Sequence, residues 1–144
     1  MAPVDVRKAE LTALKLMKVH EHLEAGHGAI FKAHGLSAPQ YNVLRILRGA
    51  GSEDLSCHQV GERMLKRVPD VTRLLDRLEQ RQLITRWRCD EDRRVVRARI
   101  TAAGRAMLAA IDAPLKARIA AEFAALTPAD LDRLDQLLDA LRGS

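Results

Sequence analysis

The side chains best suited to do chemistry are arginines and aspartates that gather between Pro69 and Arg94. A helix of about 3.6 residues per turn that starts at Pro69, a residue suited to the first helical position, has one apolar and one polar side. The apolar side holds Val71, Leu74, Leu75 and Leu78, and the outward side holds Arg73, Asp76, Arg77 and Gln80. Arginine pairs with guanine in the major groove, and threonine or aspartate contacts other base edges. The pattern predicts a DNA-contacting helix, and an ordinary solvated helix face is the alternative.

Two basic strands follow this helix. Apolar residues and arginines alternate with a period of two, which predicts a β-hairpin with a basic face. Ile84, Arg86 and Arg88 project to one side, Thr85 and Trp87 project to the other, and Val96, Ala98 and Ile100 alternate with Arg97 and Arg99. At the tip, Asp92 lies two residues before Arg94 and can hold its guanidinium in one orientation for a narrow minor groove. A self-neutralising surface turn is the alternative.

Positive charge is concentrated in this part of the chain. Residues 63–99 contain twelve Lys and Arg against six Asp and Glu, a balance of +6, whereas the whole chain has a net charge of +5. The remaining residues therefore sum to −1. Such a local patch supplies the salt-dependent, sequence-independent attraction to phosphate groups, so the charge distribution favours a nucleic acid as the anionic partner.

Length and composition predict a single domain with an aliphatic, largely helical core. The chain has 144 residues, of which 47% are hydrophobic and only 3% aromatic. It contains no apolar run of about eighteen residues and no signal-like start, so we expect a soluble, cytoplasmic protein without a membrane partner. Cys57 and Cys89 lack the spacing of a metal knuckle or a redox pair, and we expect reduced thiols.

Helices on either side must position the basic unit. Residues 5–34 have the pattern of one long helix that carries His20, His27 and His34 seven residues apart. Positions i and i+7 lie about 10 Å apart along a helix, too far to share one metal ion unaided, so we expect no metal site there. Interfacial or solvent-edge histidines are expected instead, with contact to a second chain or a ligand as the alternative. Two shorter helices, predicted at Ala38–Leu47 and Cys57–Leu65, start at S-x-x-Q capping boxes (Ser37 with Gln40, and Ser56 with Gln59).

The last two predicted helices run from Thr101 to about Ala125 and from Pro128 to about Leu141. The first should bury Met107, Leu108, Ile111, Leu115, Ile119 and Phe123, and the second carries Leu131, Leu134, Leu137, Leu138 and Leu141. A helix cannot cover so wide a leucine stripe by itself. A second copy of the chain, related by a two-fold axis, is the simplest partner.

Four motifs in order resemble the MarR family of bacterial transcriptional regulators, over nearly the whole chain. They are Leu36-Ser37-Ala38-Pro39-Gln40-Tyr41 with Val43-Leu44, then Val71-Thr72-Arg73-Leu74-Leu75-Asp76-Arg77-Leu78-Glu79, then Asp92-Arg93-Arg94, and then Ile100-Thr101-x-x-Gly104. The resemblance implies a mainly α fold with a small β-hairpin wing. In it, a winged helix-turn-helix lobe at 36–100 is flanked by N- and C-terminal dimerisation helices at 5–34 and 101–144, all within one domain.

The resemblance also implies a homodimer on a pseudo-palindromic operator, acting as a repressor. Carried over by position, the DNA contacts are Asp70, Thr72, Arg73 and Arg77 on the helix and Asp92, Arg93 and Arg94 at the wing. Arg94 would enter the minor groove with Asp92 orienting it, and Arg93 would contact phosphate. Asp70 either caps the helix or contacts cytosine. Gln82 replaces the glycine usual in the family, so we expect a helix exit that is tighter or less left-handed.

Family members usually release DNA when a small molecule, metal or oxidant binds between the dimer helices and the DNA-binding unit. Here His27, Phe31, His34, Tyr41 and Met64 are candidates for such an effector site, with core packing as the alternative. The N-terminal cysteine of the peroxide-sensing branch has no counterpart, and only Arg88 is evident as a thiolate-stabilising neighbour of Cys89. No catalytic motif is recognisable, so neither an enzyme nor a cofactor is expected; a protein-interaction module is the remaining alternative.

Overall fold

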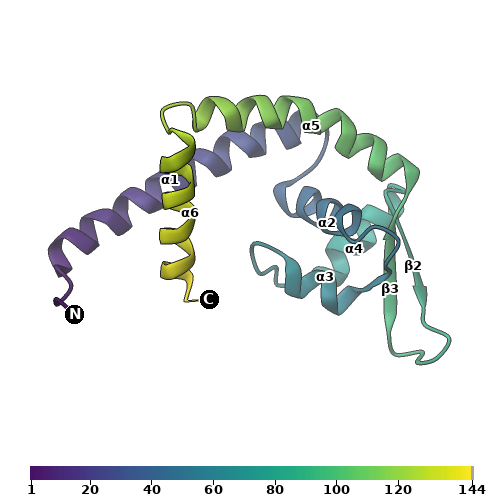
Figure 1. The fold of residues 1–144 in the computed structure, drawn as a ribbon. Coiled ribbons are helices and arrows are strands. Elements are labelled where there is room, and N and C mark those ends of the chain that lie inside the picture. The colour runs from purple at the N-terminus through teal and green to yellow at the C-terminus, as the bar shows by residue number, and fades with distance from the viewer. Residues whose placement is uncertain (144) are drawn as a thin grey trace.

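The computed structural model describes residues 1–143, and these form six helices and a three-stranded sheet (Figure 1). In chain order the elements are α1 (Val6–Ala33), α2 (Ala38–Gly49), β1 (Leu55–Ser56), α3 (Cys57–Arg63), α4 (Val71–Gln80), β2 (Ile84–Arg88), β3 (Val96–Ile100), α5 (Ala102–Glu122) and α6 (Pro128–Arg142). The expected fold class, a mainly α winged helix-turn-helix between terminal helices, is confirmed. We call residues 36–100 the lobe and α1, α5 and α6 together the scaffold.

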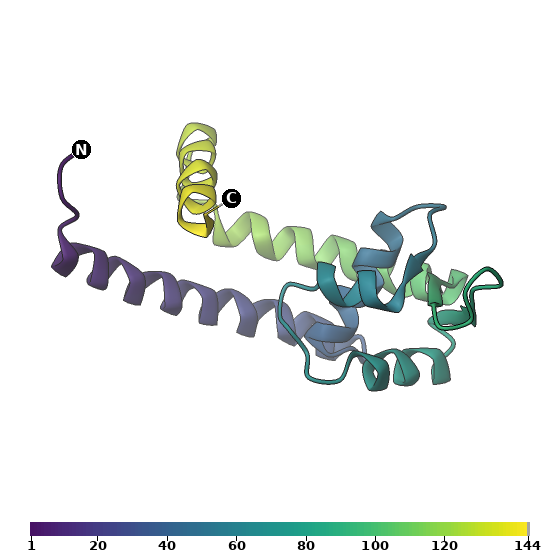
Figure 2. The same ribbon diagram turned by 90° about the horizontal axis from the view of Figure 1, so that it is seen from below.

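The scaffold extends away from the lobe. α1 and α5 come together beside the lobe, and α6 lies at the far end of α5, remote from the sheet (Figures 1 and 2). The wing formed by β2 and β3 projects from the opposite end of the molecule. None of the helices in residues 1–143 combines the length and apolar character that a membrane crossing requires.

The helix starts follow the predicted capping chemistry. The Ser37 hydroxyl accepts the Gln40 N–H at 3.2 Å while the Gln40 side chain accepts the Ser37 N–H at 2.9 Å. Ser56 with Gln59, and Thr127 with Asp130, form the same reciprocal pairs. These boxes satisfy N–H groups that a helix start leaves free, so short-range sequence alone sets these boundaries. Two helices end earlier than expected: α3 stops at Arg63 and leaves Met64 extended, and α5 stops at Glu122 instead of about Ala125.

Helix α4 begins two residues later than expected. Asp70 is its N-cap, with a carboxylate oxygen 3.0 Å from the Arg73 amide nitrogen, and Pro69 lies outside the helix. The prediction that Pro69 occupies the first helical position is therefore wrong. Aspartate at this place accepts a free N–H of the first turn, which proline cannot do, and so the cap decides the boundary.

Gln82 ends α4 in a left-handed conformation, with φ +60°. Its N–H donates to the Glu79 carbonyl at 2.9 Å, and the Leu83 N–H donates to the Leu78 carbonyl at 3.0 Å. This pair of bonds is a Schellman motif, which needs a left-handed residue at that position. The expectation of a less left-handed exit is wrong, because these bonds and the Thr101 hydroxyl bound to the Gln82 carbonyl at 2.7 Å hold the glutamine there.

The core lies in the lobe and in the half of α5 that touches it. Its fully buried large side chains are Leu44, Leu55, Leu75, Leu78, Ile84, Leu108, Ile111, Val43 and Val60. The Phe31 and Tyr41 rings stack at its edge with centroids 4.0 Å apart. Of the six residues expected to be buried on α5, Leu108 and Ile111 are buried, whereas Met107, Leu115 and Phe123 are half-buried and Ile119 is 38% exposed. The expectation fails for the second half of α5 because it extends past the lobe.

The sheet has the order β1-β3-β2, all antiparallel. The hairpin pairs Ile84 with Ile100 and Arg86 with Ala98, as its alternation predicts. The third strand, β1, pairs Leu55 with Ala98 and was not predicted. With two residues, it has no period to detect, and only its position against β3 makes it a strand.

Candidate nucleic-acid interface

The outward side of α4 presents Thr72, Arg73 and Arg77, all exposed. Among the residues that the structure describes, the guanidinium groups of Arg73 and Arg77 have no hydrogen-bond or ion-pair partner. The opposite side buries Leu75 and Leu78 in the core. The predicted separation of α4 into a buried apolar side and an exposed polar side is confirmed for these residues. Arg73 and Arg77 are therefore available to bind an anionic partner.

Asp76 does not share that outward role. Its carboxylate pairs with the guanidinium of Arg86 on β2, which also binds Glu79 at 3.1 Å. Burial acts to lower the pKa of Arg86, but the hydrogen bonds that it donates to Asp76 and Glu79 outweigh this effect, and the pKa lies above its ordinary value. The expectation of Asp76 facing outward and of Arg86 on a free basic face is wrong, because each neutralises the other.

The wing tip orients Arg94 as predicted. Arg94 Nε and Nη2 lie 3.2 and 3.3 Å from the two Asp92 carboxylate oxygens, and its N–H donates to the same side chain at 3.1 Å. The Arg94 side chain stays 91% exposed, and its guanidinium lowers the pKa of Asp92. Arg93 lies 3.7 Å from Asp90, and Arg88 donates to the Arg93 carbonyl at 2.7 Å. The tip therefore presents an exposed, pre-oriented cation.

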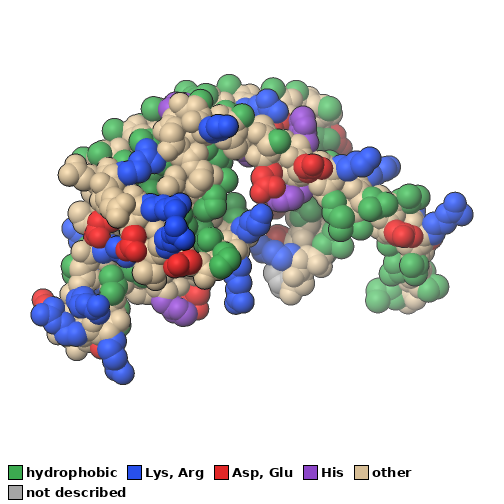
Figure 3. Space-filling view, turned by 180° about the vertical axis from the view of Figure 1, so that it is seen from behind, with side chains coloured by type: hydrophobic (Ala, Val, Ile, Leu, Met, Phe, Trp, Pro, Cys, Tyr) green, Lys and Arg blue, Asp and Glu red, His purple; other side chains and the backbone are tan. Residues whose placement is uncertain are grey.

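On the side of the sheet opposite Arg86, Asp54 binds two arginines of β3. Its carboxylate binds Arg99 at 2.8 and 3.0 Å, and its carbonyl accepts from Arg97 at 3.0 Å. The Arg99 guanidinium also lies over the Trp87 ring, 5.4 Å from its centroid. These arginines hold β3 against the loop before β1, so only part of the local charge is free. Lys and Arg side chains are spread over the lobe and wing in Figure 3.

The two cysteines occupy opposite electrostatic settings. Burial raises the pKa of the Cys57 thiol, whereas backbone N–H groups of Asp92 and Glu91, together with the Arg97 side chain, lower that of Cys89. The thiolate-stabilising groups at Cys89 are therefore these amides and Arg97, and not Arg88 as expected. Both cysteines are free thiols. Within residues 1–143, no group of three or more His, Cys, Asp or Glu is placed to hold a metal ion.

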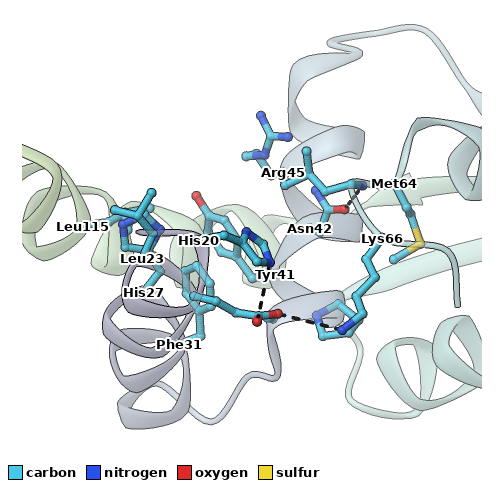
Figure 4. Close-up of a pocket in the computed structure, with 14 residues that line it drawn as sticks. His20, Leu23, His27, Phe31, Tyr41, Asn42, Arg45, Met64, Lys66 and Leu115 are labelled. Carbon is cyan, nitrogen blue, oxygen red and sulfur yellow. Dashed lines mark hydrogen bonds and ion pairs between the residues drawn. The ribbon is translucent and has the colours of Figure 1, made fainter. Parts of the chain in front are cut away.

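A cavity of about 630 Å³ lies between α1, α2 and the loop that leads to α4 (Figure 4). Four of the five predicted effector-site residues line it, namely His27, Phe31, Tyr41 and Met64. His34 does not, because its Nδ1 bonds to the Ile30 carbonyl of its own helix at 2.9 Å. Phe31 and Tyr41 belong to the core as well, so core packing is confirmed for these rings, which also line the cavity.

Three further polar side chains of the cavity wall, those of Asn42, Arg45 and Lys66, were not among the predicted effector-site residues. Asn42 accepts the Leu65 N–H at 2.9 Å with its side-chain oxygen, while its buried Nδ2 has no partner among the described residues. Arg45 and Lys66 also line the wall, and Lys66 lies 3.9 Å from Glu24. The helical spacing of Ala38, Tyr41, Asn42 and Arg45 on one side of α2 was the available signal.

Ionic contacts join α5 to two other helices, α2 of the lobe and α1 of the scaffold. Arg48 of α2 binds both carboxylate oxygens of Asp112 on α5, at 2.8 and 3.0 Å, and lowers the pKa of Asp112. Glu122 of α5 accepts from His27 at 2.8 Å and from Arg118 at 2.8 Å. The Arg118 guanidinium lies against Gly26, where a Cβ would come within 2.5 Å of it.

Comparison with known proteins identifies the relatives of this structure. The sequence profile of the MarR family matches residues 36–96. A Bacillus subtilis (strain 168) protein named as an uncharacterised HTH-type transcriptional regulator, YkoM, is 34% identical over 107 residues, covering 74% of this chain and 68% of YkoM. A MarR transcription factor from Planctomyces limnophilus has 31% identity and a TM-score of 0.72, covering 97% of this chain and 98% of that one.

Bordetella bronchiseptica BpsR, whose structure is titled for the regulation of its DNA binding by 6-hydroxynicotinic acid, has 25% identity. It superposes with a TM-score of 0.78 over 92% of this chain and 93% of its own. The relatives and the fold are those of transcription regulators rather than of a catalytic family. The chain belongs to the MarR family and is a transcriptional regulator with a DNA-binding fold.

Proposed function

We propose that this protein is a cytoplasmic, sequence-specific repressor that binds a pseudo-palindromic operator as a homodimer. The observation that carries the proposal is the pairing of two partner-free arginines on α4, Arg73 and Arg77, with an exposed Arg94 that Asp92 already orients. α4 has ten residues, a length that fits the major groove of B-DNA. The wing tip would then lie in the flanking minor groove, where arginine binds favourably.

Each predicted contact residue has a role in this proposal. Thr72 and Arg73 face base edges, and Arg77 and Arg93 contact phosphate. Asp70 is the helix cap, with one carboxylate oxygen bound to the Arg73 amide; its other oxygen is the one proposed to accept from a cytosine amino group.

The homodimer is proposed from apolar surface on the scaffold. Exposed leucines lie along the first half of α1 and along α6, and within residues 1–143 no element covers them: Leu11, Leu14, Leu131, Leu137, Leu138 and Leu141. A two-fold pairing through these helices buries that surface. It also sets two copies of α4 at the spacing of one DNA turn, about 34 Å.

Binding to the DNA upstream of the protein's own gene tests the proposal. We expect a large preference for that fragment over a scrambled duplex at about 150 mM salt, where sequence-independent attraction is weak. Equal affinity for both duplexes contradicts sequence-specific binding. Transcription from the same promoter in vitro should fall when the protein is added, and a rise identifies an activator instead.

We further propose that the cavity binds a small planar organic acid that releases DNA. Its walls join apolar side chains such as Phe31 and Leu23 to the cationic Arg45 and Lys66, a combination that suits an aromatic ring bearing a carboxylate. The regulation of BpsR by 6-hydroxynicotinic acid is consistent with this ligand class. Benzoate should raise the melting temperature of the protein more than its neutral counterpart benzamide does; equal shifts contradict an acid site.

A further inference from the structure

The side of α4 that faces the wing carries two acids that share one cation. Asp76 and Glu79 lie three residues apart, so they are neighbours on the helix surface. Both contact the guanidinium of Arg86, the third residue of β2, and Glu79 also accepts the Arg86 backbone N–H at 2.9 Å. We call these three residues the clamp. It ties the recognition helix to the first strand of the wing by both side-chain and backbone bonds.

The clamp is more buried than the ion pairs at the wing tip. The Arg86 side chain is 16% exposed, against 91% for Arg94, and its Nε is buried without a partner among the described residues. Such a cation stays in place only because two carboxylates compensate for its lost hydration. Removing the Arg86 charge would leave Asp76 and Glu79 without that partner beside the surface that meets phosphate.

The position of the clamp matters because α4 and the wing must dock on the same half-site. If α4 and the wing are held at one relative angle before binding, contact of α4 with DNA also brings Arg94 to the minor groove. No further conformational entropy is then lost to order the wing. If α4 and the wing move independently, each DNA contact requires its own ordering. Residues 81–83 connect α4 to β2, and the bonds of the clamp join the two elements directly, from Arg86 of β2 to Asp76 and Glu79 of α4.

We propose that Arg86 is a positioning residue for DNA recognition, which contacts no DNA itself but holds the recognition helix and the wing at a fixed relative angle. The inference rests on the proposed DNA-binding function and adds a residue outside the predicted contact set. It assigns Arg86 an effect on sequence preference, whereas a surface cation would affect only overall attraction.

The test uses the full-length protein and a duplex that the wild type enriches from a random-sequence library, with a scrambled duplex beside it. Arg86→Met removes one charge and the clamp. Arg99→Met is the matched control, because it removes one charge and one ion pair on the other side of the same sheet. We expect R86M to lower affinity for the enriched duplex roughly tenfold to a hundredfold. Affinity for the scrambled duplex should fall only as far as in R99M.

Melting curves establish that each variant is folded, and R86K, which keeps the charge, provides a second variant if R86M is not. R86K should retain part of the preference, because lysine cannot bind both carboxylates with a planar fork. The triple variant D76N/E79Q/R86M removes all three charges and should still lack the wild-type preference.

Two results overturn the inference: an equal loss of preference in R86M and R99M, or full recovery of the preference in the triple variant. The second would mean that Arg86 acts through charge alone. If the wild type enriches no duplex at all, the proposed DNA-binding function itself fails, and that outcome is distinct from both.

Discussion

The lobe and the scaffold differ in how far each completes its own core. α2 buries five of its 12 residues, whereas α1 buries only Phe31 of 28 and α6 buries none of 15. The lobe therefore has its hydrophobic interior within one chain. The scaffold leaves leucines at the surface, and such surface is stable in water mainly when another apolar surface covers it.

The two regions also differ in what their exposed surfaces attract. The lobe exposes the arginines of α4 and the wing tip, while acids of the lobe neutralise Arg86 and Arg99 and a backbone carbonyl binds Arg97. The scaffold exposes apolar side chains in stripes. A polyanion suits the first surface and a second copy of the chain suits the second, and this difference can be tested region by region.

Removal of α6 should have the largest effect. A chain ending at Thr127 loses the exposed leucines of α6, so we expect a monomer or an aggregate by sedimentation velocity. Affinity for the operator should fall by at least about a hundredfold, because the two half-sites are no longer bound together. The melting transition of the lobe should persist, since its core is intact.

Point variants on α6 make the same test without deleting the helix. Leu141→Asp places a charge in the apolar stripe and should weaken the dimer, whereas Asp132→Asn leaves that stripe unchanged. A truncated chain that still binds operator as a soluble monomer would remove the argument for a homodimer.

The next effect concerns the wing. Arg94→Ala should weaken operator binding by roughly 1–3 kcal/mol, the usual cost of losing one base or groove contact. The fold should be unaffected because the side chain is almost fully exposed. Fluorescence anisotropy with labelled operator measures the change, and Arg133→Ala on α6 is the charge-matched control. Unchanged affinity in R94A would show that the wing does not dock.

The contact between lobe and scaffold should show a pH dependence. Arg48 lowers the pKa of Asp112 in the folded chain, so the pair stabilises the fold above the unfolded pKa of about 3.9. That stability is lost as the pH falls through the lower, folded pKa. Because each side chain is about one-third exposed, Asp112→Asn should cost only about 1 kcal/mol at neutral pH.

Urea unfolding of wild type and D112N at several pH values measures this contribution. The difference in unfolding free energy should shrink as the pH drops below about 4. A difference that is constant with pH would assign the effect of the variant to packing rather than to the ion pair.

The smallest predicted effect is a gain of stability within the lobe. Gln82→Gly should raise the unfolding free energy by about 0.5–1 kcal/mol, because glycine adopts a left-handed φ without steric cost. Gln80→Gly, two residues earlier but inside α4, should instead destabilise by about 1 kcal/mol. Thermal unfolding distinguishes the two, and destabilisation by both variants would mean that the Gln82 side chain stabilises the turn.

Features that depend on neighbours in sequence were predictable. The capping boxes at Ser37 and Ser56 and the bond that Arg94 donates to Asp92 span four residues or fewer. The apolar side of α4 repeats with the period of a helix. Features that depend on distant partners were not. His34 looked equivalent to His27 by spacing, but only His27 reaches the cavity and the carboxylate of Glu122.

What the sequence by itself determined is the order of the elements, the separation of a basic unit from apolar helices and the family. These follow from local hydrogen bonding and from side-chain periodicity, which need no knowledge of the fold. Only the tertiary structure decided which arginines are free and which are paired, that Asp76 and Arg86 join the helix to the wing, and that Gln82 turns left-handed. Each of those outcomes depends on groups that come together only when the chain has folded.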